Sequence, residues 1–335
     1  ARMSRQVITE TVSEKEGGVR LDRWVKRRMP MTQGELEKLL RKGQIRVNGA
    51  RAKANTRLEA GMAVRLPPFK SKTADDGDGV WRAPSQPNAK ALAFLKPLIL
   101  HEDDEMFVLN KPAGIAVQGG TGQGGRHIDG MLDALSDGEH RPRLVHRLDK
   151  ATSGLLLIAK HPAAASRLGD LFHSRDLDKI YWAVTVGVPH PPAGQLRSWM
   201  RKGVDEEGRE RMIMGAHGDK ISKHAVTDYV VVTTAARRAA WVALKPSTGR
   251  MHQLRFHMHE LGNSILGDDK YETRREVPQG VGRGLHLHAR AMVVPRKSGK
   301  PLTLQAPLSG TMKQTFETLG FLESEAGRDP LDLFV

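Results

Sequence analysis

A run of polar and charged residues stands directly before one of the most apolar segments of the chain. Residues 146–154 read HRLDKATSG, and residues 155–159 read LLLIA. Polar side chains that end at a buried strand are held rigidly, which suits a reactive carboxylate such as that of Asp149. A structural ion pair at the strand entrance explains the same pattern, because such pairs are common. The residues alone leave both interpretations open.

A second polar cluster lies in residues 249–259, which read GRMHQLRFHMH and begin a short helix that Gly262 ends. The i, i+3, i+7 spacing places His252, Arg255 and His259 on one helix face. We expect this segment to combine phosphate contacts, from side chains that include Arg250 and His252, with a packed helix.

The histidines of this cluster also raise the question of a metal site. The residues four positions apart, Arg255 and His259, cannot bind zinc together, and cationic surroundings oppose a metal ion. His252 together with His286 and His288 remains a candidate ligand set, although we expect no metal.

Residues 119–125 are rich in glycine and resemble a phosphate-binding loop only in composition. That motif ends in Gly-Lys-Ser/Thr, whereas Gly125 is followed here by Arg126 and His127. The segment predicts a flexible loop over a site. Lys111 and Pro112, which follow a strand, predict a turn.

The elements that must position these residues indicate an α+β protein. Helical spacing predicts a helix over residues 164–172, but predicted strands adjoin other strands more often than helices separate them. This order favours a mixed, mostly antiparallel sheet over a doubly wound parallel one. The predicted strands are residues 106–109, 155–159, 181–188, 227–233, 239–244 and 285–294.

A compact basic module precedes this region. Residues 17–70 hold 14 Lys and Arg against four Asp and Glu, a net charge of +10 out of +15 for the chain. Two helices are predicted at residues 21–29 and after Thr32, which begins a capping box with Glu35; Asn48-Gly49 predicts a hairpin turn. The basic residues that lie off the apolar positions are Arg20, Arg23, Arg27, Arg41, Lys42, Arg46, Arg51 and Lys53.

Composition limits the classes of function. The chain has no cysteine, which excludes disulfides, zinc–thiolate sites and thiol nucleophiles and fits a reducing cytoplasm. A sequence pI near 10.1 favours a polyanionic partner such as nucleic acid. The longest apolar run has about six residues (239–244), and no signal segment opens the chain, so we expect a cytoplasmic, non-membrane protein.

Taken together, these segments resemble the RluA-type pseudouridine synthases. The resemblance runs from residue 98 to residue 306. It rests on five motifs in order: LNKPAG at 109–114, HRLDKATSGL at 146–155, KIY at 179–181, GRMHQLRFH at 249–257 and LHA at 287–289. The basic module resembles the S4-like αL RNA-binding motif through VRLD at 19–22 and GQIRVNG at 43–49. Within the family, residues 110–120 are most similar to RluC-type members, which modify large-subunit ribosomal RNA.

Composition predicts a linker over residues 70–97 and an acidic, frayed tail over 323–335. The resemblance implies an S4-like domain over residues 1–69 and a catalytic domain over 98–322. It also implies an activity without cofactor or metal, the isomerisation of uridine to pseudouridine in 23S ribosomal RNA. We expect a monomer.

By resemblance, Asp149 is the nucleophile, with Arg255 as its charge partner. Tyr181 stacks on the base and is a candidate proton carrier, and Arg147 fills the space that the extruded base leaves. We weigh three alternatives: a pseudouridine synthase acting on transfer RNA, an inert RNA-binding assembly factor, and a histidine-based metallohydrolase acting on RNA.

Overall fold

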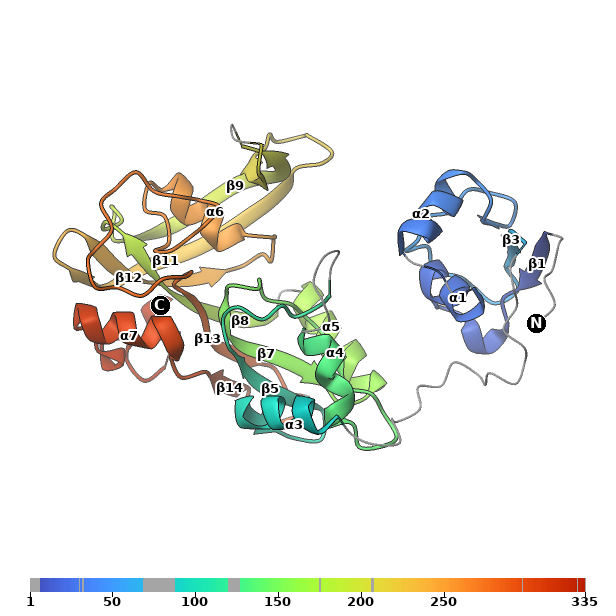
Figure 1. Cartoon of the computed structure of the whole chain (residues 1–335), viewed down its shortest axis with the longest axis horizontal. Coiled ribbons are helices and arrows are strands. Elements are labelled where there is room, and N and C mark those ends of the chain that lie inside the picture. The colour runs from blue at the N-terminus through green and yellow to red at the C-terminus, as the bar shows by residue number, and fades with distance from the viewer. Residues whose placement is uncertain are drawn as a thin grey trace. The chain divides into compact units, whose positions relative to one another are not determined.

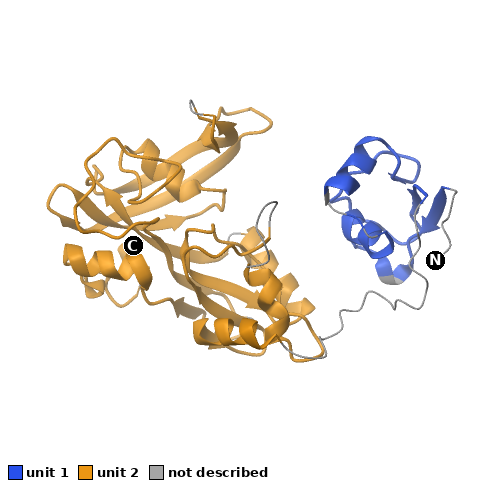
Figure 2. Cartoon of the chain, viewed as in Figure 1, with its two compact units in different colours: residues 1–81 blue, residues 82–335 orange. Residues whose placement is uncertain are grey.

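The computed structural model describes residues 7–29, 31, 33–68, 88–119, 127–174, 176–205, 208–296, 298–329 and 331–334. The chain divides into two compact units, Ala1–Trp81 and Arg82–Val335 (Figure 2). Each unit has its own apolar core.

The small unit packs two helices on a three-stranded antiparallel sheet of order β1-β3-β2. Trp24, Val25 and Leu36 are buried on the apolar faces of the helices, as their spacing predicts. Asn48 and Gly49 both have positive φ angles, 48° and 77°, which confirms the predicted hairpin turn. Its elements are β1 (Ile8–Thr11), η1 (Glu14–Glu16), α1 (Leu21–Arg28), α2 (Gln33–Arg41), β2 (Arg46–Val47) and β3 (Ala63–Leu66).

The large unit is built on a mixed sheet with eleven strands among the described residues (Figure 1). The main path is β10-β9-β11-β12-β8-β13-β7-β5-β4; β14 pairs with β13, and β6 pairs with β7. The strands are β4 (Ile99–Glu102), β5 (Met106–Lys111), β6 (Arg143–Leu144), β7 (Ser153–Ala159), β8 (Asp178–Val186), β9 (Ala193–Val204), β10 (Glu210–Met214), β11 (Lys223–Ala235), β12 (Ala239–Pro246), β13 (Leu287–Val294) and β14 (Leu302–Gln305).

Of the described strand pairs only β13 with β7 is parallel, which confirms the expected mostly antiparallel sheet. Every residue of β7 is buried, as its unbroken apolar run predicts. The polar side chains His288 and Arg290 of β13 are buried and half-buried, and both bond to the carbonyl of Ala306, which lies over this face of the sheet.

Helices cover both faces of the sheet. Apolar side chains of β12 point alternately into two cores, one that includes Leu254 and Met258 of α6 and one that includes Met312 and Phe316 of α7. The helical elements of the large unit are α3 (Ala89–Leu95), η2 (Lys96–Leu98), α4 (Ile128–Met131), η3 (Leu132–Leu135), α5 (Pro162–Ser174), α6 (Gln253–Glu260), α7 (Gly310–Leu319), η4 (Glu323–Ala326) and η5 (Asp332–Phe334). None of the described helices is long and apolar enough to cross a membrane.

Two boundary expectations need correction. Residues 89–95 of the expected linker form α3, whose first turn is capped by the Asn88 side chain accepting from the Ala91 N–H. The expected frayed tail is not frayed where it is described: Ala326 is buried, and Leu331, Leu333 and Phe334 pack against the core beside α7. In both cases a few apolar residues outweigh the polar composition around them. Thr32 and residues 120–126, for which a cap and a loop are predicted, lie outside the described residues.

Candidate active site

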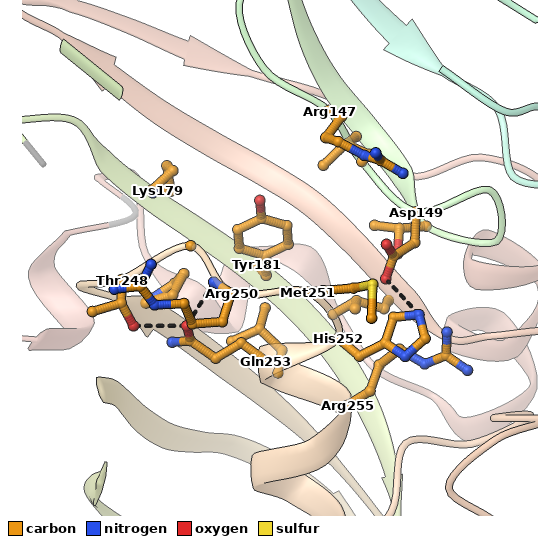
Figure 3. Close-up of a pocket in the computed structure, with 16 residues that line it drawn as sticks. Arg147, Asp149, Lys179, Tyr181, Thr248, Arg250, Met251, His252, Gln253 and Arg255 are labelled. Carbon is orange, nitrogen blue, oxygen red and sulfur yellow. Dashed lines mark hydrogen bonds and ion pairs between the residues drawn. The ribbon is translucent and has the colours of Figure 1, made fainter. Parts of the chain in front are cut away.

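Two hollows in the large unit meet at Asp149. The smaller, called here the base hollow, has a volume of about 260 Å³ and is lined by Lys179 and Tyr181 among others. The larger, called here the groove, has about 1110 Å³. Both are lined by Arg147, Asp149, Met251, His252 and Arg255. The fold therefore brings together the catalytic residues that the sequence predicts, with Arg147, Arg250 and His252 beside them (Figure 3).

Asp149 lies in the loop between β6 and β7, and its side chain is 27% exposed. Its backbone carbonyl accepts a hydrogen bond from the Thr152 N–H at 3.1 Å. This bond closes a turn that leads into β7. The only ion pair recorded for its carboxylate within the described part of the chain is with His252, with 3.8 Å between Oδ2 and Nε2. The carboxylate thus faces the hollow and is not held in a strong structural pair.

A buried lysine braces this loop from behind. Lys111, at the end of β5, is fully buried, and its Nζ donates to the carbonyls of Pro112, Ile115 and Lys150 at 2.9–3.2 Å. Burial lowers the pKa of Lys111 to about 8, although the negative charge of Asp149 opposes the shift. The predicted turn at this position is present, but the lysine ties it to the loop that carries Asp149.

Tyr181 projects from β8 into the base hollow, with its hydroxyl directed away from the strand (Figure 3). Burial raises the pKa of this phenol well above its usual range, and the nearby Asp149 carboxylate raises it further. The tyrosine is therefore a neutral hydrogen-bond donor at pH 7. Its ring is the aromatic surface of the hollow.

The second wall of the hollow is the turn that starts α6. His252 precedes the helix in a left-handed conformation, φ 52° and ψ 21°, and burial lowers its pKa while Asp149 partly offsets the shift. Gln253 fixes this turn: its Oε1 accepts from the Thr248 hydroxyl and from the Arg250 N–H, and its Nε2 donates to the Val226 carbonyl. The strain at His252 is thus held by a dense hydrogen-bond network.

Arg255, the expected charge partner of Asp149, pairs directly with two other acids. The guanidinium, 4% exposed, donates to both carboxylate oxygens of Asp268 at 2.7 and 2.5 Å and to Asp269 at 2.8 Å. Burial alone would lower the pKa of Arg255, but Asp268, with a contribution from Asp149, raises it. The Nε and Nη2 groups of Arg255 are held by Asp268 and Asp269, and the guanidinium interacts with Asp149 through its charge.

The structure does not assemble the candidate metal ligands. His286 bonds to the Leu266 carbonyl and the Thr315 hydroxyl, and His288 bonds to the Ser153 hydroxyl and the Ala306 carbonyl. Both rings are fully buried and use both nitrogens. His252 lies apart from them in the base hollow, and the described residues contain no cluster of three side chains suited to a metal ion.

The basic residues of the small unit divide into two groups. Arg20 forms a bidentate pair with Asp22, and Arg46 donates to the carbonyls of Gly43 and Gly49, so both help to hold the fold. The Arg51 guanidinium lies beside the same glycine, Gly43. Of the basic side chains named from the sequence, those that are exposed are Arg23, Arg27, Arg41, Lys42, Arg51 and Lys53.

Sequence reasoning missed Lys111, Gln253 and the acidic partner Asp268 as parts of this site. Lys111, at the end of an otherwise apolar strand, could have been recognised from the sequence, because a lysine is almost never fully buried unless its charge is paired. Nothing local marked Asp268, which lies 13 residues from Arg255 and is brought to it by the turn after α6.

Comparison with protein-family models gives two matches. Residues 105–260 match the RNA pseudouridylate synthase model, and residues 19–64 match the S4 domain model. The first match includes Asp149, Tyr181 and Arg255, and the second lies within the small unit.

Similar curated proteins extend over most of the chain. A ribosomal large subunit pseudouridine synthase C of Rickettsia felis is 36% identical over 292 residues, which cover 86% of this chain and 93% of that protein. The protein of the same name from Escherichia coli K12 is 33% identical and covers 93% and 98% of the two chains. Among solved structures, human RNA pseudouridylate synthase domain containing 4 has a TM-score of 0.57 and 30% identity over 69% of this chain and 97% of its own.

Proposed function

Because the chain belongs to the RNA pseudouridylate synthase family, we propose that it converts uridines of large-subunit ribosomal RNA to pseudouridine, with Asp149 as the nucleophile. The observation that carries the assignment of Asp149 is its place at the meeting point of the base hollow and the groove, with no strong ion-pair partner of its own among the described residues. In the reaction the C1′–N1 bond of uridine breaks, the uracil turns, and a C1′–C5 bond forms with release of the C5 proton.

Asp149 acts as a covalent catalyst only in its ionised form. The positive charge of Arg255, held in place by Asp268, and that of Lys111 behind the loop favour the ionised carboxylate. Because neither cation forms a close ion pair with Asp149, the carboxylate oxygens stay free to attack.

Tyr181 provides the surface for the uracil ring. Its neutral hydroxyl is placed to donate a hydrogen bond or to pass a proton within the base hollow. A base inside an RNA helix must leave its stack to reach this hollow, which costs a few kcal/mol. Arg147, exposed at the rim, is the residue we assign to the space that the base vacates.

Replacement of Asp149 tests the assignment. Asp149→Asn keeps the shape of the side chain and removes its charge, so we expect RNA binding within about twofold of the wild type and no pseudouridine formation. Release of tritium from large-subunit transcripts labelled at uracil C5 measures the reaction. Turnover by the Asn variant, after mass spectrometry has excluded deamidation back to Asp, would refute the nucleophile.

Ribosomal RNA is proposed as the substrate because the similar curated proteins are named ribosomal large subunit pseudouridine synthase C. The similarity covers nearly the full length of those proteins. Pseudouridine mapping of ribosomal and transfer RNA from cells with and without the gene separates the possibilities. Pseudouridines missing only from transfer RNA would favour a pseudouridine synthase that acts on transfer RNA. No missing site in either RNA, with RNA still bound, would favour an inert assembly factor.

We also propose that the protein works as a monomer in the cytoplasm. Asp149, Tyr181 and Arg255 meet within one copy of the chain, so a second copy is not needed to bring them together. Sedimentation of the protein at micromolar concentration measures its mass, and a dimer with activity only above its dissociation constant would contradict the monomer.

A further inference from the structure

We propose that the groove beside Asp149 binds the phosphate backbone of the RNA strand next to the target uridine, with Lys150 and Arg283 as its phosphate contacts. The inference rests on the proposed function, since it assigns to the same site the path of its substrate. It adds a binding subsite whose far wall lies outside the matched segment 105–260, on the approach to β13 and the start of α7.

The volumes of the two hollows suit different parts of a nucleic acid. The base hollow, about 260 Å³ with the Tyr181 ring on its wall, offers room for one base. The groove is about four times larger, at about 1110 Å³. Because the two share Arg147, Asp149 and Met251, a strand whose target base occupies the base hollow must continue from Asp149 into an adjoining space. The groove is the larger of the spaces that open there.

The charges of the groove suit phosphate. Arg147, Lys150 and Arg283 line it, are exposed, and form no ion pair with any acid in the described ranges. Of its two acidic residues, Asp269 is bound by Arg255 and Asp149 is the proposed nucleophile. Lys270 donates to the Glu210 carbonyl. Three exposed cations that form no ion pair in these ranges and share one concave surface attract an anion, and the anion that an RNA strand brings past Asp149 is phosphate.

The position of these cations follows from the fold. Lys150 is the neighbour of Asp149 in the loop before β7, and Arg283 stands on the opposite side, where its carbonyl accepts from the hydroxyl of Thr311 in the first turn of α7. Ser309, Gly310 and Thr311 form that wall. The positive end of the α7 dipole adds to the potential that the side chains create.

The primary test replaces Arg283 in the full-length protein. We expect Arg283→Ala to weaken binding to an in vitro transcribed large-subunit RNA about three- to tenfold and to flatten the dependence of log K on log salt by about 0.7. The single-turnover rate at saturating enzyme should stay within twofold, because Arg283 does not touch the reacting atoms. Arg283→Lys, which keeps the charge, should recover most of the affinity.

Arg237→Ala is the matched control, since it removes an equally exposed arginine, in the turn between β11 and β12, that lines neither the base hollow nor the groove. Wild-type affinity and salt slope in Arg283→Ala would overturn the groove assignment while leaving the proposed function intact. An inactive wild-type protein on every RNA tested would instead refute the proposed function.

A second pair of variants avoids the question of folding. Asp and Asn are both good helix N-caps, so Ser309→Asp and Ser309→Asn should each support α7, but only Asp places a negative charge at the groove wall. We expect the Asp variant to bind RNA at least threefold more weakly than the Asn variant at low salt, with equal melting temperatures. Equal affinities would contradict a phosphate path along this wall.

Discussion

The Tyr181 phenol stays protonated because burial and the Asp149 carboxylate both oppose its ionisation. A side chain in that state contributes to catalysis by donating its hydroxyl proton, while its ring supports the base. Tyr181→Phe keeps the ring and removes the hydroxyl alone. We therefore expect the single-turnover rate to fall about 10²- to 10⁴-fold with RNA affinity unchanged. Rapid-quench tritium release with filter binding measures both quantities, and equal loss of rate and affinity would assign the hydroxyl to structure.

Buried histidines make the protein sensitive to acid. Burial lowers the pKa of His257 and of His288 to about 4, from an ordinary value near 6.5. Between these pH values the unfolded chain binds protons that the folded chain does not. The free energy of unfolding is therefore undiminished by these histidines above pH 6.5 and falls as the pH drops towards 4. Each histidine should lower the free energy of unfolding by about 2 kcal/mol at pH 4.5.

Urea unfolding at pH 7 and pH 4.5 measures this loss. His288→Gln should lose less stability between the two pH values than the wild type, whereas His217→Gln, at an exposed position, should lose the same amount. Identical pH dependence in all three proteins would show that His288 binds its proton equally in both states.

Residue types near the reaction were predictable from sequence, but their partners were not. The polar run before β7 marked Asp149 as a candidate, but its role and that of Tyr181 were assigned from the resemblance of their motifs. The pairing of Arg255 with Asp268 depends on a turn that only the folded chain defines. Sequence therefore identified charged groups of the site, but not Asp268 as the direct partner of Arg255.

At the level of elements, the close parallel pairing of β7 and β13 fixes the loop that carries Asp149. Gly154 has φ +107°, and a Cβ at this position would lie 2.3 Å from the Ala289 carbonyl oxygen. The parallel pair can approach only because this residue lacks a side chain.

Gly154→Ala should therefore destabilise the large unit by roughly 2–6 kcal/mol, the sum of backbone strain and overpacking. Thermal unfolding monitored by circular dichroism measures the loss. Gly169→Ala, on α5 where a Cβ meets open space, is the control and should not destabilise. A melting temperature for Gly154→Ala within about 2 °C of the wild type would contradict the close approach.

Elements with strong periodicity were predicted well, and elements without it were missed. Buried runs gave β7 and β12, and helical spacing gave α5. Strands β9 and β10 carry exposed and polar residues on both faces, so no alternation marked them. Helix α3 escaped because acidic and proline-rich residues precede it; its own seven residues are mostly apolar.

Across the whole molecule, we expect the small unit to add affinity for RNA to a large unit that carries out the chemistry and holds the strand beside Asp149. All residues assigned to the reaction lie in Arg82–Val335, which has its own cores, whereas residues 17–70 carry net +10. A fragment that starts near Ser85 should fold and retain chemistry on RNA at high concentration, but bind ribosomal RNA more weakly. Its log K should also depend less on log salt, by about 0.7 for each phosphate that the fragment no longer binds. Filter binding of both proteins at several salt concentrations measures this, and equal affinities and slopes would contradict the division of labour.

The position of β13 also has a consequence for synthesis on the ribosome. Asp149 precedes β7, and Tyr181 lies on β8. Strand β13, residues 287–294, lies between β7 and β8 in the sheet. At about 5–20 residues per second, the interval between the emergence of β8 and that of β13 is on the order of 5–20 seconds. During that time the edges of β7 and β8 that later pair with β13 are unpaired and can pair with other chains. A nascent chain of this protein is thus most vulnerable to aggregation just before its active site is assembled.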